Sequence, residues 1–192
     1  MSYVALKPRD IPNLLTVLRI LLVVPIVWLL LQERFGETLI LFVIAGATDG
    51  IDGFLAKQFS WTSALGGILD PLADKVLLTS TILILGWQEN LPYWLVVMVV
   101  LRDIMIVLLA IGYHYLVEPL KPEPIFISKI NTLFQILLVL TVLFSNGAIP
   151  LPATITMVLI YCVGLTTLLS GFTYGWKWGR RALQRRGQTD AL

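Results

Sequence analysis

The sequence predicts an all-α integral membrane protein built as a bundle of six transmembrane helices. Of its 192 residues, 57% are hydrophobic and only 14% are charged, a charged share well below that of soluble domains. The apolar residues lie in continuous runs of helix length, whereas a membrane barrel would have short alternating segments. These runs leave little chain for anything else, so we expect a single membrane domain over residues 1–192.

Each of the six runs approaches the roughly 20 residues that a helix needs to span a bilayer. Loop-forming residues separate them, notably Gly36, Pro92, the proline-rich stretch 118–124 and the stretch 146–152. A short charged lead, residues 1–10, precedes the first run. In chain order the predicted spans are 14–32, 38–56, 67–86, 91–116, 126–144 and 153–174.

Basic residues set the expected orientation, because short cytoplasmic loops of membrane proteins are enriched in lysine and arginine. With the N-terminus in the cytoplasm, the opposite side receives only Arg34. The group at 177–186 fits a positive-inside anchor, and a site for anionic lipid is the alternative. The cytoplasmic side receives Lys7, Arg9, Lys57, Lys121, Lys177, Arg180, Arg181, Arg185 and Arg186.

Composition argues against several function classes. The single cysteine, Cys162, lies in an apolar run and cannot build a disulfide framework or a thiolate metal site. A net charge of +2 is too small to suggest a nucleic-acid partner. No cleavable signal or transit peptide is evident, so we expect a bacterial inner (plasma) membrane protein with its site at the cytoplasmic side, and a mature organellar form stays open.

Four carboxylates inside the predicted spans are the main functional signal, because a charge in hydrocarbon needs a partner or a water-filled site. Asp49 and Asp52 are spaced i, i+3, and Asp70 and Asp74 are spaced i, i+4, so each pair shares a helix face. Both pairs flank the same short cytoplasmic loop, and we expect them to meet. Four close carboxylates would repel without cations, and hard oxygen ligands suit magnesium, manganese or calcium. Ion transport or a proton relay is the alternative.

These residues resemble a known family. The pattern D-x2-D-G-x2-A-R-x8-G-x3-D-x3-D is the signature of the CDP-alcohol phosphotransferases, and the stretch from Asp49 to Asp74 matches it. Every fixed position agrees apart from one, since Lys57 occupies the place of the family's arginine. Lysine keeps the positive charge but lacks the planar fork of arginine, so a diphosphate contact there would be a point charge.

The resemblance implies a fold and a chemistry. Similar proteins have six membrane helices, an amphipathic N-terminal lead and usually a homodimeric assembly. They use two divalent cations, Mg²⁺ or Mn²⁺, to hold the diphosphate of a CDP-linked lipid while an acceptor hydroxyl displaces CMP. By motif position, Asp49, Asp52, Asp70 and Asp74 would be metal ligands, and Asp74 would also be the catalytic base.

The resemblance also implies a nucleotide site formed by Asp49, Asp52, Gly53, Ala56 and Lys57, whose small residues leave room for cytidine. Asn13, in the segment that enters the first span, would contact the nucleotide as well. A helix N-cap is the alternative for Asn13, because an apolar run begins directly after it.

Four basic residues remain inside the spans, Arg19, Lys75, Arg102 and Lys129, and all but Lys75 carry a prediction. Arg102 and Lys129 match positions that bind the acceptor's phosphate in relatives with phosphate-bearing acceptors. An intramembrane ion pair with Asp103 is the alternative for Arg102. For Arg19, a site role and snorkelling toward the headgroups stay equally open.

Segments outside the motif resemble one subgroup of the family. Residues 63–66, 124–132 and 174–181 are similar to the CMP-forming cardiolipin synthases of the mitochondrial type. That resemblance implies CDP-diacylglycerol as donor and phosphatidylglycerol as acceptor. The alternative is a phosphatidylglycerophosphate synthase, which uses glycerol 3-phosphate. From a different class, a membrane transporter or an inactive lipid-binding homologue stays open.

Overall fold

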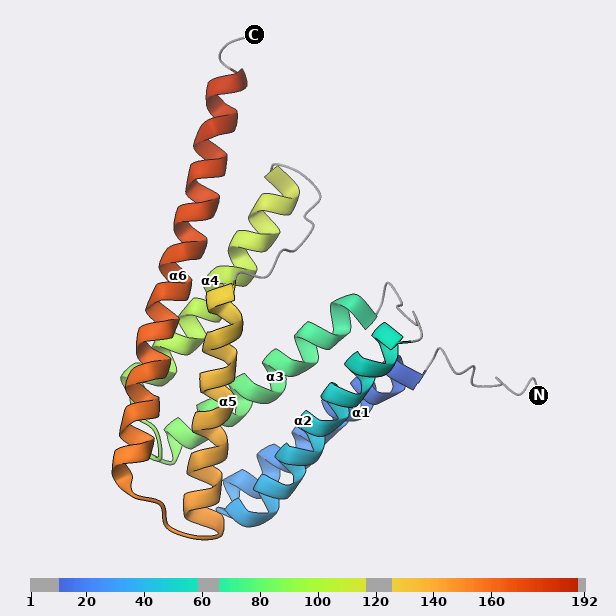
Figure 1. The fold of residues 1–192 in the computed structure, drawn as a ribbon, viewed down its shortest axis with the longest axis vertical. Coiled ribbons are helices and arrows are strands. Elements are labelled where there is room, and N and C mark those ends of the chain that lie inside the picture. The colour runs from blue at the N-terminus through green and yellow to red at the C-terminus, as the bar shows by residue number, and fades with distance from the viewer. Residues whose placement is uncertain (1–10, 59–65, 117–125, 190–192) are drawn as a thin grey trace, which may run out of the picture. The chain divides into compact units, whose positions relative to one another are not determined.

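The computed structural model describes the backbone of residues 11–58, 66–116 and 126–189, and the side chains of 16–48, 73–108 and 126–175. Within these ranges the chain is all helical, which confirms the predicted all-α class (Figure 1). The six helices are α1 Ile11–Leu31, α2 Phe35–Gln58, α3 Gly66–Trp87, α4 Tyr93–Leu116, α5 Phe126–Gly147 and α6 Ala153–Thr189.

The helices coincide with the six predicted apolar runs to within three residues at each end, apart from the end of α6. α6 continues to Thr189, well past the predicted end at 174. The added stretch contains four arginines, a lysine and two glutamines, residues that favour helix but not hydrocarbon. α1 begins at Ile11, so Asn13 lies in its first turn and not at the predicted N-cap position.

The described helices form two compact units. Unit 1 comprises Met1–Asn90 and Val139–Leu151, and unit 2 comprises Leu91–Leu138 and Pro152–Leu192. Helix α5 therefore contributes its first part to unit 2 and its last part to unit 1. This division does not test the expectation of a single membrane domain over residues 1–192, which stays a prediction.

In unit 1, α1 packs against both α2 and α3. Its buried residues Ile26, Leu29 and Leu30 follow i, i+3, i+4 spacing and form one apolar face. Arg19 of α1 pairs with Asp74 of α3, and the amide of Gln88, the residue after α3, donates to the Leu30 carbonyl of α1 at 2.5 Å. The earlier residue of α1 contacts the start of α3 and the later residue contacts its end, so α1 and α3 run parallel.

The turns that close helices α1 and α3 have glutamate, and not glycine, at the left-handed position. Glu33 and Glu89 adopt left-handed backbone angles, with φ of 57° and 61°. Beyond each of them a 6→1 hydrogen bond closes the turn, from Arg34 N to Leu29 O at 3.0 Å and from Asn90 N to Leu85 O at 2.9 Å. These are Schellman ends, which satisfy carbonyl groups that a helix terminus leaves open.

Unit 1 also contains a close backbone contact between α2 and the end of α5. A Cβ added at Gly147 would lie 2.7 Å from the Gly36 Cα and 2.7 Å from the carbonyl carbon of Phe35. Nearby, the Asn146 amide donates to Asn90 Oδ1 at 2.8 Å. The glycine pair is therefore required for this approach of the two helix ends.

In unit 2, α4 packs against α6, where glycines of α6 lie against large side chains of α4. A Cβ added at Gly164 of α6 would lie 3.1 Å from the Trp94 ring of α4, and Trp94 stacks on Tyr161 with ring centroids 6.5 Å apart. Leu95, Val99 and Arg102 of α4 are buried and share one face of that helix. This face also positions the Arg102 guanidinium.

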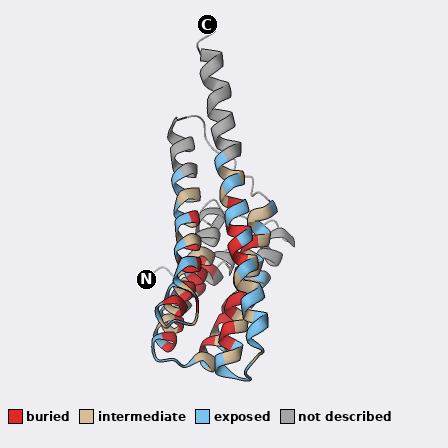
Figure 2. Cartoon of the chain, turned by 90° about the vertical axis from the view of Figure 1, so that its left-hand side faces the viewer, coloured by how far each residue is buried: buried red, intermediate tan, exposed pale blue. Residues whose placement is uncertain are grey.

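Two helices are long and apolar enough to cross a membrane among the residues described, the whole of α5 and the segment Ala153–Gly175 of α6. In the most apolar segment of each helix, only 33% and 28% of the residues are buried. The rest of the described chain therefore does not enclose these helices. Figure 2 shows buried residues along one side of the helices and exposed residues along the other. Large apolar side chains such as Leu108, Leu165 and Phe172 are among those exposed. Such a surface suits lipid better than water.

Candidate functional site

The acidic motif is divided between two consecutive helices. Asp49 and Asp52 lie in the last part of α2, and Asp70 and Asp74 lie in the first part of α3. Figure 1 shows these two helix ends at the same end of unit 1. The backbone thus confirms that the motif lies on two helices joined by one short connection.

Of the four acids, Asp74 is the one whose side chain the structure describes. It is 45% exposed, and its Oδ1 lies 2.5 Å from Arg19 Nη1. The side chains of Asp49, Asp52 and Asp70 lie outside the described residues. Whether all four carboxylates meet therefore stays a prediction.

Arg19 lies within the folded interior and not at its surface. The side chain is 0% exposed, which is unusual for an arginine and requires a compensating partner. That partner is an acid of the motif, Asp74. Of the two possibilities for Arg19, this contact favours a role at the site over snorkelling toward the headgroups.

The predicted nucleotide contacts are placed by their backbone alone. Gly53, Ala56 and Lys57 lie on the last turns of α2, next to the acids, and Asn13 lies in the first turn of α1, a helix that packs against α2. Their side chains lie outside the described residues, and their roles stay predictions.

The donor set of the motif suits a hard divalent cation. Carboxylate oxygens without thiolate or imidazole are the ligands of Mg²⁺ and Mn²⁺, and the 45% exposure of Asp74 lets an ion reach it. Among the described side chains, no three His, Cys, Asp or Glu residues lie together as a metal-binding group. Three of the four predicted ligands are outside that set.

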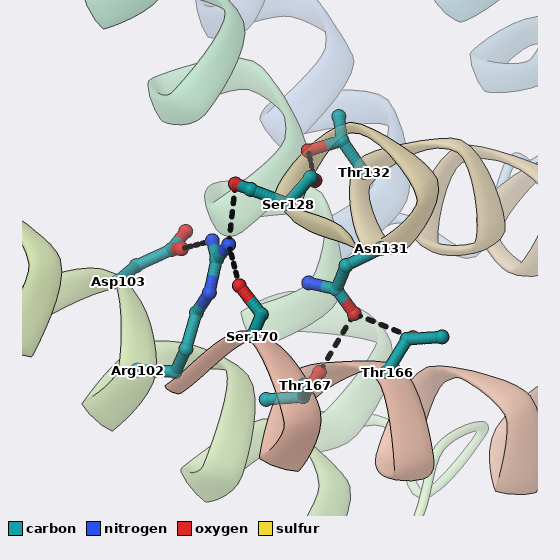
Figure 3. A network of polar contacts seen from close by, with 8 residues as sticks. All are labelled: Arg102, Asp103, Ser128, Asn131, Thr132, Thr166, Thr167 and Ser170. Carbon is teal, nitrogen blue, oxygen red and sulfur yellow. Dashed lines mark hydrogen bonds and ion pairs between the residues drawn. The ribbon is translucent and has the colours of Figure 1, made fainter. Parts of the chain in front are cut away.

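Unit 2 contains a buried polar cluster centred on Arg102 of α4 (Figure 3). The guanidinium donates through Nη1 to Asp103 Oδ1 and through Nη2 to Ser128 Oγ and Ser170 Oγ, each at 2.6 Å. Ser128 belongs to α5 and Ser170 to α6, so one planar group joins three helices. The ion pair with Asp103 is present, as the structural alternative for Arg102 predicted.

The cluster continues along α5 to Asn131. Its Oδ1 accepts hydrogen bonds from Thr166 Oγ1 at 2.8 Å and from Thr167 Oγ1 at 2.9 Å, both on α6. One turn further, Gln135 is buried at 2% exposure. Within the part of the chain that the structure describes, Arg102 Nε, Asn131 Nδ2 and Gln135 Nε2 are buried donors without a hydrogen-bond partner. Each such donor costs about 1–3 kcal/mol unless a ligand or water satisfies it.

Sequence reasoning missed the polar residues of this cluster apart from Arg102 and Asp103. The signal was available: Ser128, Asn131 and Gln135 recur at i, i+3, i+7 in an otherwise apolar helix. Lys129, the predicted companion of Arg102, follows Ser128 and is exposed. Its predicted contact with the acceptor phosphate is untested, as is the role of the basic group at 177–186, whose side chains lie outside the described residues.

Comparison with known proteins agrees with these features. Residues 9–169 match the model of the CDP-alcohol phosphatidyltransferase family. Two CMP-forming cardiolipin synthases, from Rattus norvegicus and Homo sapiens, are 34% and 32% identical to this chain over 93% of its length. The chain covers 64% of the length of each of these two relatives.

A second group of relatives carries a different name. A CDP-diacylglycerol–glycerol-3-phosphate 3-phosphatidyltransferase from Aquifex aeolicus is 33% identical over 71% of this chain and 77% of its own length. The family match includes both halves of the acidic motif on α2 and α3, and it covers the polar cluster apart from Ser170. On this evidence the chain belongs to the CDP-alcohol phosphatidyltransferase family.

Proposed function

We propose that this chain is a CMP-forming cardiolipin synthase, which transfers a phosphatidyl group from CDP-diacylglycerol to phosphatidylglycerol. The observation that carries the proposal is the intact acidic motif divided between the joined ends of α2 and α3, with Asp74 paired to Arg19. The similarity to relatives of that name over 93% of the chain supports the choice of acceptor.

In the proposed reaction, an acceptor hydroxyl oxygen forms a bond to the phosphorus that carries diacylglycerol, and the bond from that phosphorus to CMP breaks. Asp49, Asp52, Asp70 and Asp74 would hold two divalent cations, which supply charge neutralisation for the diphosphate and the leaving CMP when bound. Asp74 would accept the hydroxyl proton. Its pairing with Arg19 orients the carboxylate from the buried side, which leaves its exposed side open to substrate.

The donor's nucleotide would lie against Gly53, Ala56 and Lys57, with Asn13 close by. Small residues at the first two positions allow the ligand to approach the α2 backbone, and Lys57 supplies positive charge for the diphosphate.

Arg102 and Lys129 would bind the phosphate of the acceptor. Arg102 is buried and held by partners on three helices, so its guanidinium is preorganised for a phosphate oxygen. It is already neutralised by Asp103, which favours a singly charged phosphodiester over a phosphomonoester of higher charge. This charge balance favours phosphatidylglycerol over glycerol 3-phosphate.

We also propose that all six helices span the membrane, with the N-terminus and the acidic site on the cytoplasmic side, and that the chain forms a homodimer. The bias of basic residues supports that orientation. A bacterial plasma membrane remains our proposal for the compartment.

Product analysis tests this proposal. Purified chain is incubated with CDP-diacylglycerol and Mg²⁺ or Mn²⁺, and with either phosphatidylglycerol or glycerol 3-phosphate. We expect CMP release with phosphatidylglycerol and a product of cardiolipin mass. A product with glycerol 3-phosphate alone would instead support phosphatidylglycerophosphate synthase, the activity named for the Aquifex relative. No CMP release under any condition would support a transporter or an inactive homologue.

A further inference from the structure

The polar cluster of unit 2 has two donors on α5 and one on α4 that the described chain does not use. Asn131 Nδ2, Gln135 Nε2 and Arg102 Nε have no hydrogen-bond partner among the described residues. The three side chains are 0%, 2% and 5% exposed, so bulk water does not satisfy them in this arrangement. Buried amide groups are rarely left in this state without a ligand or an ordered water.

The neighbouring threonines fix which way the Asn131 amide faces. Thr167 donates its hydroxyl hydrogen to Asn131 Oδ1 at 2.9 Å, and Thr166 lies 2.8 Å from the same oxygen. The oxygen is therefore held toward α6. In Figure 3 the amide nitrogen points away from both threonines, toward the side on which Ser170 and Arg102 lie.

The polar groups along this cluster change from charged to neutral. Ser128, Asn131 and Gln135 share one face of α5 and extend over about 10 Å of helix axis. At the Ser128 end is the Arg102 guanidinium, 2.6 Å from the Ser128 hydroxyl, and further along are two neutral amides. The unpaired buried atoms of this cluster are all donors, so an occupant that reaches them must accept hydrogen bonds.

We propose that Asn131 and Gln135 bind the ester carbonyl oxygens of a diacylated acceptor lipid whose phosphodiester lies at Arg102. This inference rests on the proposed function and on the proposed orientation, in which α5 begins at the cytoplasmic side. A glycerophospholipid presents its groups in the same order with increasing depth: an anionic phosphodiester first, then ester carbonyls that only accept, then the acyl chains. Glycerol 3-phosphate has no such carbonyls. The two amides would therefore favour an acceptor that carries acyl esters over glycerol 3-phosphate.

The test compares two phosphatidylglycerols with the same headgroup and chain length, one ester-linked and one ether-linked, because the ether lipid has no carbonyl oxygens. KM and kcat are measured for each with wild-type chain, Asn131→Leu, Gln135→Leu and the control Thr132→Val. Thr132 is on the same helix, but its hydroxyl donates to the Ser128 carbonyl at 3.1 Å. Elution from size exclusion in detergent confirms that each variant is folded.

We expect wild-type and Thr132→Val chains to have a three- to tenfold lower KM for the ester lipid, the effect of one or two net hydrogen bonds. In Asn131→Leu and Gln135→Leu the ratio of the two KM values should approach one, because KM for the ester lipid rises while KM for the ether lipid changes little. Equal use of both lipids by the wild-type chain, or equal losses on both lipids in the variants, would overturn the inference and leave the amides a packing or water-binding role. The proposed function fails separately, if neither lipid yields cardiolipin.

Discussion

Arg19 of α1 and Asp74 of α3 form an ion pair in which the arginine is fully buried and the carboxylate is 45% exposed, with Nη1 and Oδ1 2.5 Å apart. The pair joins an interior cation to the last acid of the motif. It links the packing of unit 1 to the proposed chemistry, because the same carboxylate contacts both the core and the open side of the helices.

Asp74→Asn is expected to lower both activity and stability. The change removes the negative charge that faces buried Arg19, and we expect a loss of about 2 kcal/mol, less than the ~3–5 kcal/mol of a fully buried pair because Asp74 is half exposed. The double variant Arg19→Met with Asp74→Asn should recover most of the melting temperature but no CMP release. The prediction is wrong if the double variant is less stable than Asp74→Asn alone.

Metal binding is expected to be measurable without turnover. Titration with Mn²⁺, followed by electron paramagnetic resonance, should detect about two bound ions per chain, as a two-metal phosphoryl-transfer site requires. Asp70→Asn should weaken this binding at least tenfold. Glu37→Gln is the matched control, since Glu37 pairs with Arg34 at an exposed position. Equal binding by both variants would contradict the assignment of Asp70.

Arg102→Lys is expected to raise KM for the acceptor by about ten- to hundredfold while KM for CDP-diacylglycerol stays within twofold. Lysine keeps the charge, but its ammonium cannot reproduce the fork that reaches Asp103, Ser128 and Ser170 together. Steady-state kinetics with each substrate varied in turn separates the two constants. A rise confined to the donor's KM would place Arg102 at the other substrate.

Lys57→Arg restores the family's residue in the motif and is expected to lower KM for CDP-diacylglycerol a fewfold, because arginine binds a diphosphate through two parallel hydrogen bonds. Lys177→Arg, the same change outside the motif, serves as the control and should leave KM unchanged. An unchanged KM in Lys57→Arg would indicate that this position does not contact the diphosphate.

Gly147→Ala is expected to destabilise unit 1 by about 1–3 kcal/mol, the usual effect of overpacking. The new Cβ would lie 2.7 Å from the Gly36 Cα, where only backbone could move. Gly46→Ala is the control: nothing lies within 4 Å of its added Cβ, and alanine should favour helix by about 0.5–1 kcal/mol. Thermal unfolding in detergent, followed by tryptophan fluorescence, compares the two. Similar melting temperatures would contradict the close contact.

The amino-acid sequence by itself determined the helical class, the six elements and the positions of the motif. Apolar runs of helix length and the helical spacing of Asp49 with Asp52, and of Asp70 with Asp74, are local properties that periodicity records. The family's signature is equally local, and the match over 9–169 confirmed it. The conformation at the helix ends could not be predicted from the sequence, because Glu33 and Glu89 close α1 and α3 in a left-handed conformation more typical of glycine.

Only the tertiary structure decided which polar side chains meet. Arg19 and Asp74 are 55 residues apart, and Arg102 and Ser170 are 68 apart, so no pattern within one helix relates them. The structure paired Arg19 with an acid of the motif and grouped Arg102 with Ser128, where sequence reasoning had named Lys129. The physical reason is that a buried charge or amide must find its partner across helix interfaces, and the packing of α1 on α3 and of α4 on α6 determines those partners.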